Sequence, residues 1–291
     1  MKKLLTIVAI AAIAISPCMA IHFDGGAGAG DPNWNTAANW SDDNVPTAAT
    51  EVQALDVAIG YGVVVNNPGA QALYIDVGTW GWPGKMTVAS AGTLSLAENL
   101  FIAQDPGVTG TVTNDGLITV TAAVYMQGGI GSLVNNGTLT SAGMILGNIA
   151  TSTCTVENTG LMNINGWLYL SLLGQSSVFN MNGGNLNTAN IEMPAGGIGH
   201  LNLHDGVITN AAIGLNGNGD YTIEVGYGEM YSAGDHTAGL DFMIGAGLIT
   251  GESSMSPYSS FDGTYTILGA IPEPAILGLI AILGLAFLRR K

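Results

Sequence analysis

Charged residues are scarce in this chain of 291 residues, and basic residues are almost absent from its interior. Charged side chains make up only 9% of the sequence, and Lys85 is the only lysine or arginine between Ile21 and Ile271. Twenty carboxylates share that stretch, which gives residues 21–271 a net charge of −19 at pH 7. Such a charge repels phosphate backbones and anionic lipid headgroups. The composition therefore excludes nucleic acid as a partner.

Cysteine is equally scarce, because only Cys18 and Cys154 occur. Cys18 lies in a leader segment, so Cys154 has no disulfide partner once that segment is removed. Cys154 stands between two threonines in a strand-like stretch, and the sequence implies no histidine partner for it. We expect a small core residue rather than a catalytic thiol.

The first twenty residues, 1–20, have the three parts of a secretory signal peptide. Two lysines are followed by an apolar stretch from Leu4 to Ile15, and the segment ends with the small residue Ala20. The pattern predicts cleavage by signal peptidase after Ala20. Lipid attachment at Cys18 is a weaker alternative, because this cysteine follows a proline instead of a small residue.

The opposite end of the chain, residues 272–291, also has three parts. The first part is a proline-flanked glutamate, at Pro272, Glu273 and Pro274. An uncharged and mostly apolar run follows at 275–288, and the basic end consists of Arg289, Arg290 and Lys291. An α-helix needs about 20 residues to cross a bilayer core, so the apolar run is a little short, and its basic end would stay in the cytoplasm.

In this order and at this position, the three parts resemble a PEP-CTERM tail, the sorting sequence that exosortases process in bacteria of the Gram-negative type. The resemblance covers about twenty residues and carries no information on the fold. It implies that the tail is a hydrophobic helix that anchors the precursor transiently in the inner membrane. Exosortase would then be a partner, and the body would reach the cell surface or the extracellular matrix.

Between the two ends, one short pattern recurs, in which a glycine is followed two positions later by an apolar residue. The intervals between successive glycines are 24, 21, 23, 24 and 22 residues, and the glycines are Gly92, Gly116, Gly137, Gly160, Gly184 and Gly206. The two GGIG segments at 128 and 196 are separated by 68 residues, which is three such periods. A constant period of this size is typical of a solenoid.

Three groups of apolar positions recur in each period. The first follows the glycine and comprises Leu94, Ile118, Leu139, Met162, Leu186 and Ile208. The second is a pair further along, from Leu100 and Ile102 in the first repeat to Ile213 and Leu215 in the last. The third lies four residues before the next glycine, at Val112, Leu133 and Val156, and later repeats keep it poorly. Three short strands and three turns per 23 residues predict an all-β, single-chain parallel β-helix.

A polar column accompanies these apolar ones. The residues two positions before the repeat glycines are Asn114, Asn135, Asn158, Asn182 and then His204. Stacked asparagines can bond to one another and to turn backbone along the axis of the coil stack. We therefore predict a structural asparagine ladder, with the glycines supplying positive φ in the turns.

The expected β-helix coils occupy 60–228, with an N-terminal cap at 21–59 and cap strands at 229–271. Caps are needed because an open end exposes unpaired strand and apolar core. Within the first cap, Trp34, the triplet from Asn39 to Ser41 and the pair Val45-Pro46 resemble the entry segment of exported β-repeat proteins with PEP-CTERM tails.

Catalytic and metal-binding patterns are weak. Polysaccharide lyases need a Lys or Arg base and hydrolases need clustered carboxylates, whereas this body offers Lys85 and acids at differing repeat positions. We expect no enzyme activity and no cofactor. His200 and His204 would lie about 13 Å apart on a strand, too far for one metal ion. A turn with Asn216, Asn218 and Asp220 is a weak calcium candidate, with an ordinary Asn-Gly turn as the alternative.

The segment GTWGWPGK at 78–85 places Trp80 and Trp82 among glycines. Such rings can stack on sugar faces as a carbohydrate-binding site, or they can cover the edge of the first coil. The sequence thus favours a non-catalytic exported structural or adhesive protein of the cell envelope or matrix. The alternative is a carbohydrate-active enzyme or a carbohydrate-binding protein that acts on an extracellular polysaccharide.

Overall fold

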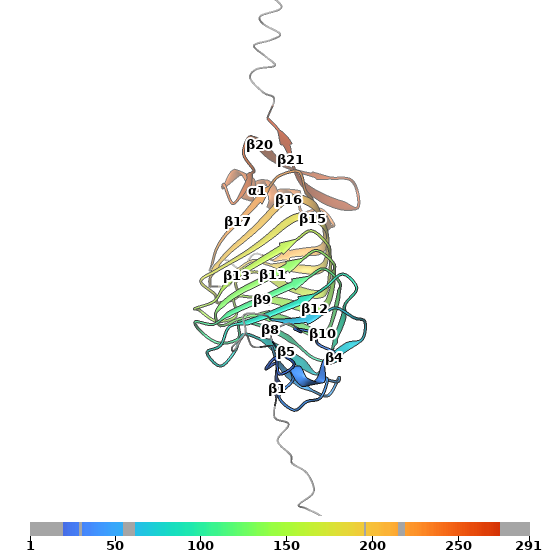
Figure 1. Ribbon diagram of the computed structural model, residues 1–291. Helices are drawn as coiled ribbons and strands as arrows, with labels where there is room; N and C mark the ends of the chain where they lie inside the picture. Colours follow the sequence, from blue (N-terminus) through green and yellow to red (C-terminus); the bar gives the residue numbers. More distant parts are fainter. Residues whose placement is uncertain (1–19, 29–30, 55–61, 195, 215–218, 274–291) are drawn as a thin grey trace, which may run out of the picture.

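The computed structural model describes residues 20–28, 31–54, 62–194, 196–214 and 219–273, and shows an all-β solenoid (Figure 1). It has about eight turns that repeat about every 23 residues, which confirms the predicted fold class and period. Residues 1–19 of the predicted signal peptide, Pro274 and the rest of the predicted sorting tail, and Asn216 and Asn218 lie outside the described residues.

Each full coil contributes one strand to each of three faces, and the strands within a face pair in parallel. The first face contains β4 (Ala70–Ala72), β7 (Thr93–Leu96), β18 (Glu229–Ala233) and the opening parts of β10 (Leu117–Met126), β12 (Thr138–Leu146) and β14 (Leu161–Tyr169). The second face contains β1 (Ile21–His22), β2 (Glu51–Ala54), β5 (Tyr74–Val77), β8 (Leu100–Ile102) and the closing parts of β10, β12 and β14.

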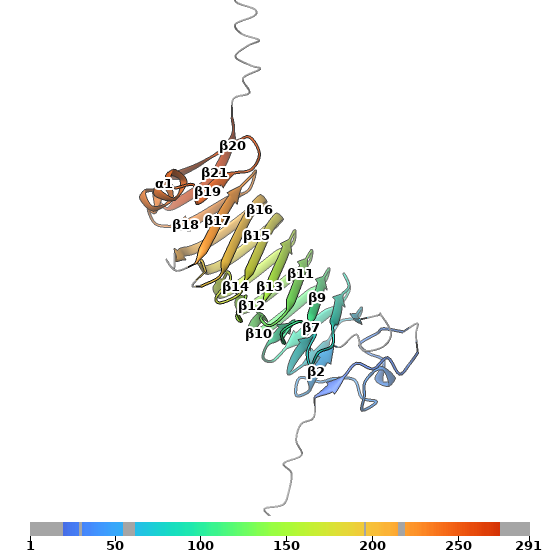
Figure 2. The ribbon, with the colours of Figure 1, turned by 90° about the vertical axis from the view of Figure 1, so that its left-hand side faces the viewer.

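The third face contains β3 (Val63–Val65), β6 (Gly84–Val88), β9 (Thr109–Asn114), β11 (Ile130–Asn135), β13 (Thr153–Asn158), β17 (Asp220–Val225) and β19 (Ile249–Gly251). Two long strands, β15 (Ser176–Glu192) and β16 (Ile198–Gly214), bend around the coil and pair on all three faces. Figure 2 shows the coils stacked from the blue N-terminal segment to the hairpin at the opposite end.

The predicted inward column of the first face is confirmed. Leu94, Ile118 and Leu139 are register partners and fully buried, and the same holds for Met162, Leu186 and Ile208. On the second face the predicted pairs are buried as far as Ile191 and Met193. Ile213 is only partly buried, and Leu215 lies outside the described residues. Stacking gives each of these side chains a like neighbour above and below.

The third inward column is longer than the sequence suggested. Val156 pairs with Phe179, which pairs with Leu201 and then Ile223, and all four side chains are buried. The expectation that later repeats keep this column poorly was wrong. The reason is that the later corners differ in length, so counting back from the repeat glycine misses residues that the strand pairing aligns.

The repeat glycines are needed mainly for close packing between coils. A Cβ on Gly137 would lie 2.2 Å from the carbonyl oxygen of Gly116, and a Cβ on Gly160 would lie 2.1 Å from that of Gly137. Positive φ was the predicted reason, but among the six repeat glycines it occurs only at Gly184 and Gly206. At the others glycine is required because neighbouring coils approach too closely for any side chain.

The N-terminal segment lies against the first coils. Trp34 and Trp40 are buried and pack edge to face, with ring centroids 4.8 Å apart. The indole Nε1 of Trp40 donates to the carbonyl oxygen of Trp34 at 2.8 Å, and the backbone N–H of Trp34 donates to Val64 at 2.8 Å. The short 3-10 helix η1 (Ala37–Asn39) precedes Trp40. The two tryptophans therefore bring apolar surface and backbone pairing to the first coils.

At the other end, parallel pairing continues through β18 and β19 before the chain reverses. β20 (Met255–Phe261) and β21 (Tyr265–Pro272) form an antiparallel hairpin, and β21 pairs antiparallel with β18. The helix α1 (Thr237–Gly245) packs beside them through Leu240 and Met243. No helix in the described part of the chain has both the length and the apolar character needed to cross a bilayer.

Candidate functional site

Three asparagines on the inner side of the third face form a ladder that crosses the coils. Nδ2 of Asn114 donates to Oδ1 of Asn135 at 2.7 Å, and Nδ2 of Asn135 donates to Oδ1 of Asn158 at 2.7 Å. All three side chains are fully buried and also donate to backbone carbonyls at the turn. The ladder predicted from the sequence is therefore confirmed for these three residues.

The ladder does not continue through Asn182 and His204, so that part of the prediction was wrong. Asn158 pairs with Met181, and its Nδ2 lies 3.4 Å from the sulfur of Met181. The turn after Met181 is one residue longer than the turn after Asn158, since Leu161 pairs with Asn185. Because strand side chains alternate, this one-residue shift turns Asn182 outward, where it is exposed.

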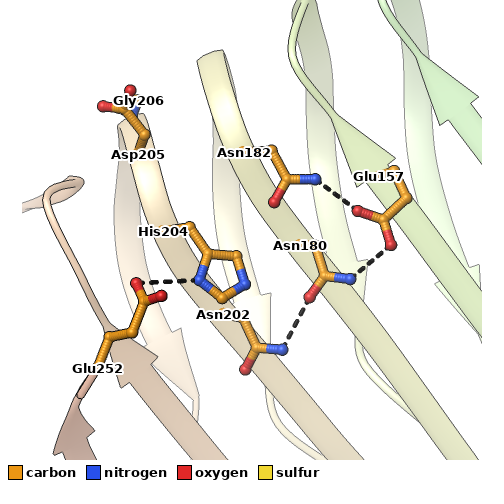
Figure 3. A network of polar contacts seen from close by, with 8 residues as sticks. All are labelled: Glu157, Asn180, Asn182, Asn202, His204, Asp205, Gly206 and Glu252. Carbon is orange, nitrogen blue, oxygen red and sulfur yellow. Dashed lines mark hydrogen bonds and ion pairs between the residues drawn. The ribbon is translucent and has the colours of Figure 1, made fainter.

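The outward side of the same face has a second polar row, seen in Figure 3. Asn180 and Asn182 donate their Nδ2 atoms to the two carboxylate oxygens of Glu157, each at 2.6 Å. Asn202 in turn donates to Oδ1 of Asn180 at 2.7 Å. Glu157, Asn180 and Asn202 are register partners in successive coils, so the row follows the axis. It joins the coils from outside, as the buried ladder does from inside.

The two histidines in this region have local partners. Nδ1 of His204 lies 3.1 Å from a carboxylate oxygen of Glu252, and Nδ1 of His200 lies 2.7 Å from the hydroxyl of Thr222. Asp205 accepts from the backbone N–H of Gly206. Within the described ranges, no three His, Cys, Asp or Glu side chains are grouped so that they could hold a metal ion. Of the calcium candidates, Asp220 is described and lies exposed at the start of β17.

The loop between β5 and β6 carries the two predicted sugar-binding tryptophans. Trp80 has φ of 56° and Gly81 has φ of 81°, and the backbone N–H of Trp82 donates to the carbonyl oxygen of Thr79 at 2.9 Å. These features describe a tight two-residue turn of type I′. The side chain of Trp80 is 74% exposed and that of Trp82 is 48% exposed. The turn therefore presents both indoles to solvent.

Asp105, from the next coil, holds this loop. Its Oδ2 accepts from the hydroxyl of Thr79 at 3.0 Å and from the backbone N–H of Trp80. The amide nitrogen of Gln104 donates to the hydroxyl of Thr79 at 3.1 Å and lies 3.3 Å from both carboxyl oxygens of Asp76. One chain of polar groups thus joins the tryptophan loop to Asp76.

Asp76 is a buried acid, although its position in β5 points away from the core. Its side chain is only 5% exposed. Burial raises the pKa of Asp76 to about 7, and the carboxylates of Asp105 and Glu51 contribute to the same increase. Glu51 accepts from the phenol of Tyr74 at 2.8 Å. Glu51 and Asp105 thus act on Asp76 from the two neighbouring coils.

The outer surface of the second face has a row of half-buried aromatic rings beyond Asp76. Phe101 follows Asp76 in register, and its ring stacks on Tyr125 with centroids 5.3 Å apart. Two coils further along, Trp167 stacks on Tyr169 at 5.8 Å and remains 44% exposed. Because Phe101 and Tyr125 face each other along the axis, they offer a ligand mainly their edges.

A cavity of about 340 Å³ lies between Ile213 and the first turn of α1. Its polar groups are already engaged, because Asp235 accepts from Thr237 and Nε2 of His236 lies 2.8 Å from the carbonyl oxygen of Ala233.

On the third face, Cys154 is buried as expected, and burial raises the pKa of its thiol to about 11.

Sequence reasoning identified Trp80 and Trp82 but missed the groups that support them. Asp76 looked like an ordinary outward residue between Ile75 and Val77, since nothing local shows that the next coil covers it. The outer row was missed as well, although Glu157, Asn180 and Asn202 recur at intervals of 23 and 22 residues. A search of each outward column for polar residues at the repeat spacing would have found it.

No protein-family model matches this chain, and no curated protein or solved structure is similar enough to count as a match.

Proposed function

We propose that this protein is an exported, non-catalytic structural or adhesive element of the bacterial cell envelope or extracellular matrix. The observation that carries the proposal is the continuity of the stack. Parallel pairing runs from β1 and β2 to β17 and β19, and the coils are joined inside by the asparagine ladder and outside by the Glu157 row. A body of this kind suits a load-bearing or spacing role.

The distribution of acids also favours a non-catalytic role. Asp76 is the carboxyl whose pKa is raised to about 7, mainly by burial and further by the carboxylates of Asp105 and Glu51. Asp76 is buried, and Asp105 is bound to the loop backbone. A general acid needs to lie within hydrogen-bond reach of its substrate. A carboxyl as deeply buried as that of Asp76 meets that requirement poorly.

Export and sorting complete the proposal. Signal peptidase removes residues 1–20, the apolar run 275–288 holds the precursor in the inner membrane, and exosortase cuts near Pro272-Glu273-Pro274. The body then reaches the cell surface or the matrix. These steps rest on the sequence of the two termini and on the resemblance of the tail to exosortase substrates.

Intact-mass analysis of the protein from its native host tests the sorting steps. The mature protein is expected to begin at Ile21 and to lack the apolar run and Arg289, Arg290 and Lys291. An exosortase-deficient strain is expected to retain the tail in its membrane fraction. Recovery of wild-type protein with its basic end intact contradicts the sorting proposal. Release of reducing ends from surface polysaccharides by the purified protein contradicts the proposal that the protein is non-catalytic.

Carbohydrate binding is a second candidate function, favoured by the exposure of Trp80 and Trp82. Exposed indoles stack on the apolar faces of sugar rings. The tight turn and its bond to Asp105 hold the two indoles on an ordered backbone, which reduces the entropy lost on binding. Binding of purified protein to a polysaccharide array, compared between wild type and a Trp80→Ala, Trp82→Ala double variant, tests this function.

A further inference from the structure

The charge around the tryptophan loop is predominantly negative. Asp105 is bonded to the loop backbone, and residues 21–271 carry a net charge of −19. Lys85, three residues after Trp82 and exposed on β6, is the only lysine or arginine in the described part of the chain. A ligand that reaches Trp80 and Trp82 therefore enters the field of an acidic surface.

This combination discriminates between classes of glycan. The face of an indole attracts cations more strongly than any other aromatic side chain does, and nearby carboxylates add to that attraction. A uronic acid or a sulfated sugar would meet repulsion from the same carboxylates. A neutral sugar can stack on the indoles but gains nothing from the surrounding charge.

We propose that the Trp80–Trp82 loop selects glycans that carry protonated amino groups, as glucosamine polymers do, over neutral and acidic glycans. The inference rests on the carbohydrate-binding function proposed above and defines its ligand class. The ammonium group approaches an indole face, and the carboxylate of Asp105 favours its presence near the loop. The positive charge of Lys85 repels the same ammonium group and therefore lowers the affinity.

Titration of the full-length protein in mild detergent with three oligosaccharides of equal length tests the proposal. The probes are a glucosamine oligomer, an N-acetylglucosamine oligomer and a galacturonate oligomer, at a mildly acidic pH at which the glucosamine amines are protonated. Trp80→Ala and Trp82→Ala are compared with Trp167→Ala, because Trp167 lies on another part of the surface and is 44% exposed, close to the 48% of Trp82. Lys85→Gln completes the set, and equal thermal midpoints confirm that the variants are folded.

The expected result is tightest binding of the glucosamine oligomer. Trp80→Ala should weaken that binding at least about fivefold, through loss of a cation–π contact. Trp167→Ala should leave it unchanged, and Lys85→Gln should strengthen it. Added salt should weaken glucosamine binding more than N-acetylglucosamine binding.

Three results would overturn the inference, and they have different consequences. Equal, Trp80-dependent binding of the N-acetylated oligomer preserves carbohydrate binding but removes the preference for amino sugars. Glucosamine binding that survives both tryptophan substitutions shows general attraction to the acidic body, without a site at the loop. If none of the three oligomers binds, the carbohydrate-binding function fails as well, while the structural role remains subject to its own test.

Discussion

The side chains of Asn114 and Asn135 join two adjacent coils through a hydrogen bond. Nδ2 of Asn114 lies at a distance of 2.7 Å from Oδ1 of Asn135, and both side chains are fully buried. A buried amide is costly unless its donors and acceptors are paired. The asparagine therefore adds to the stability that stacking provides only when it is present and in register. This dependence makes the ladder the most direct place to test the architecture.

Asn135→Ala should lower the free energy of unfolding by about 1 to 3 kcal/mol, because it leaves Asn114 without its acceptor and Asn158 without its donor. Asn165→Ala is the matched control, since Asn165 is exposed, and it should change stability by less than about 0.5 kcal/mol. Urea denaturation followed by circular dichroism measures both. Equal effects of the two substitutions would mean that the ladder does not stabilise the stack.

Val88→Asn should be tolerated unusually well for a polar substitution in the core. Val88 is the register partner of Asn114, and Oδ1 of Asn114 is buried without a hydrogen-bond partner. The new amide can donate to that oxygen, so we expect a cost below about 1 kcal/mol. Val112→Asn, which places an amide between Met86 and Leu133, should cost several times more. Thermal midpoints that fall equally for both variants would contradict the described register.

The contribution of Asp76 to the stability of the protein should fall as the pH rises towards neutrality. Asp76 has its pKa raised from 3.8 to about 7, so the folded chain keeps a proton that the unfolded chain has lost. This contribution is complete below pH 3.8, decreases as the pH rises to about 7, and is constant above that value. Asp76→Asn should remove the decrease, whereas Asp220→Asn, at an exposed site, should leave it in place. The free energy of unfolding, measured at a series of pH values, provides the comparison.

Cys154 should not react with thiol reagents while the protein is folded. Its side chain is 1% exposed, and the raised pKa of about 11 leaves almost no thiolate at neutral pH. Alkylation in native buffer is therefore expected to be slow and to become rapid in denaturant. Fast modification of the native protein, detected by mass spectrometry, would indicate that the third face opens easily at this coil.

The period and the inward columns were predictable because they repeat. Strand pairing places Leu94 above Ile118 and Ile118 above Leu139, so a spacing in the sequence becomes a contact in space. The prediction failed where a corner changed length by one residue, at Asn182, because alternation then reverses the side chain. Asn182 and Met181 differ by a single position, which averaging over repeats does not resolve.

Of the candidate site, the sequence predicted the two exposed tryptophans but not the residues that support them. Trp80 and Trp82 are conspicuous in the sequence, and their glycine neighbours indicate a turn. Their support comes from Asp105, which is 25 residues from Trp80 in the sequence and lies in the next coil. Such contacts arise from the packing of nonrepetitive loops, so they leave no periodic signal.

The direction of the hydrogen bonds between coils has a mechanical consequence. In a parallel stack these bonds run along the axis, so tension applied between the two ends pulls directly on them and detaches coils one at a time instead of all together. Each coil that detaches releases about 80 Å of chain in place of about 4.8 Å of axial rise. A body pulled between a surface and a neighbour would thus lengthen in steps and dissipate force, and the antiparallel hairpin at β21 would oppose the first step from its end.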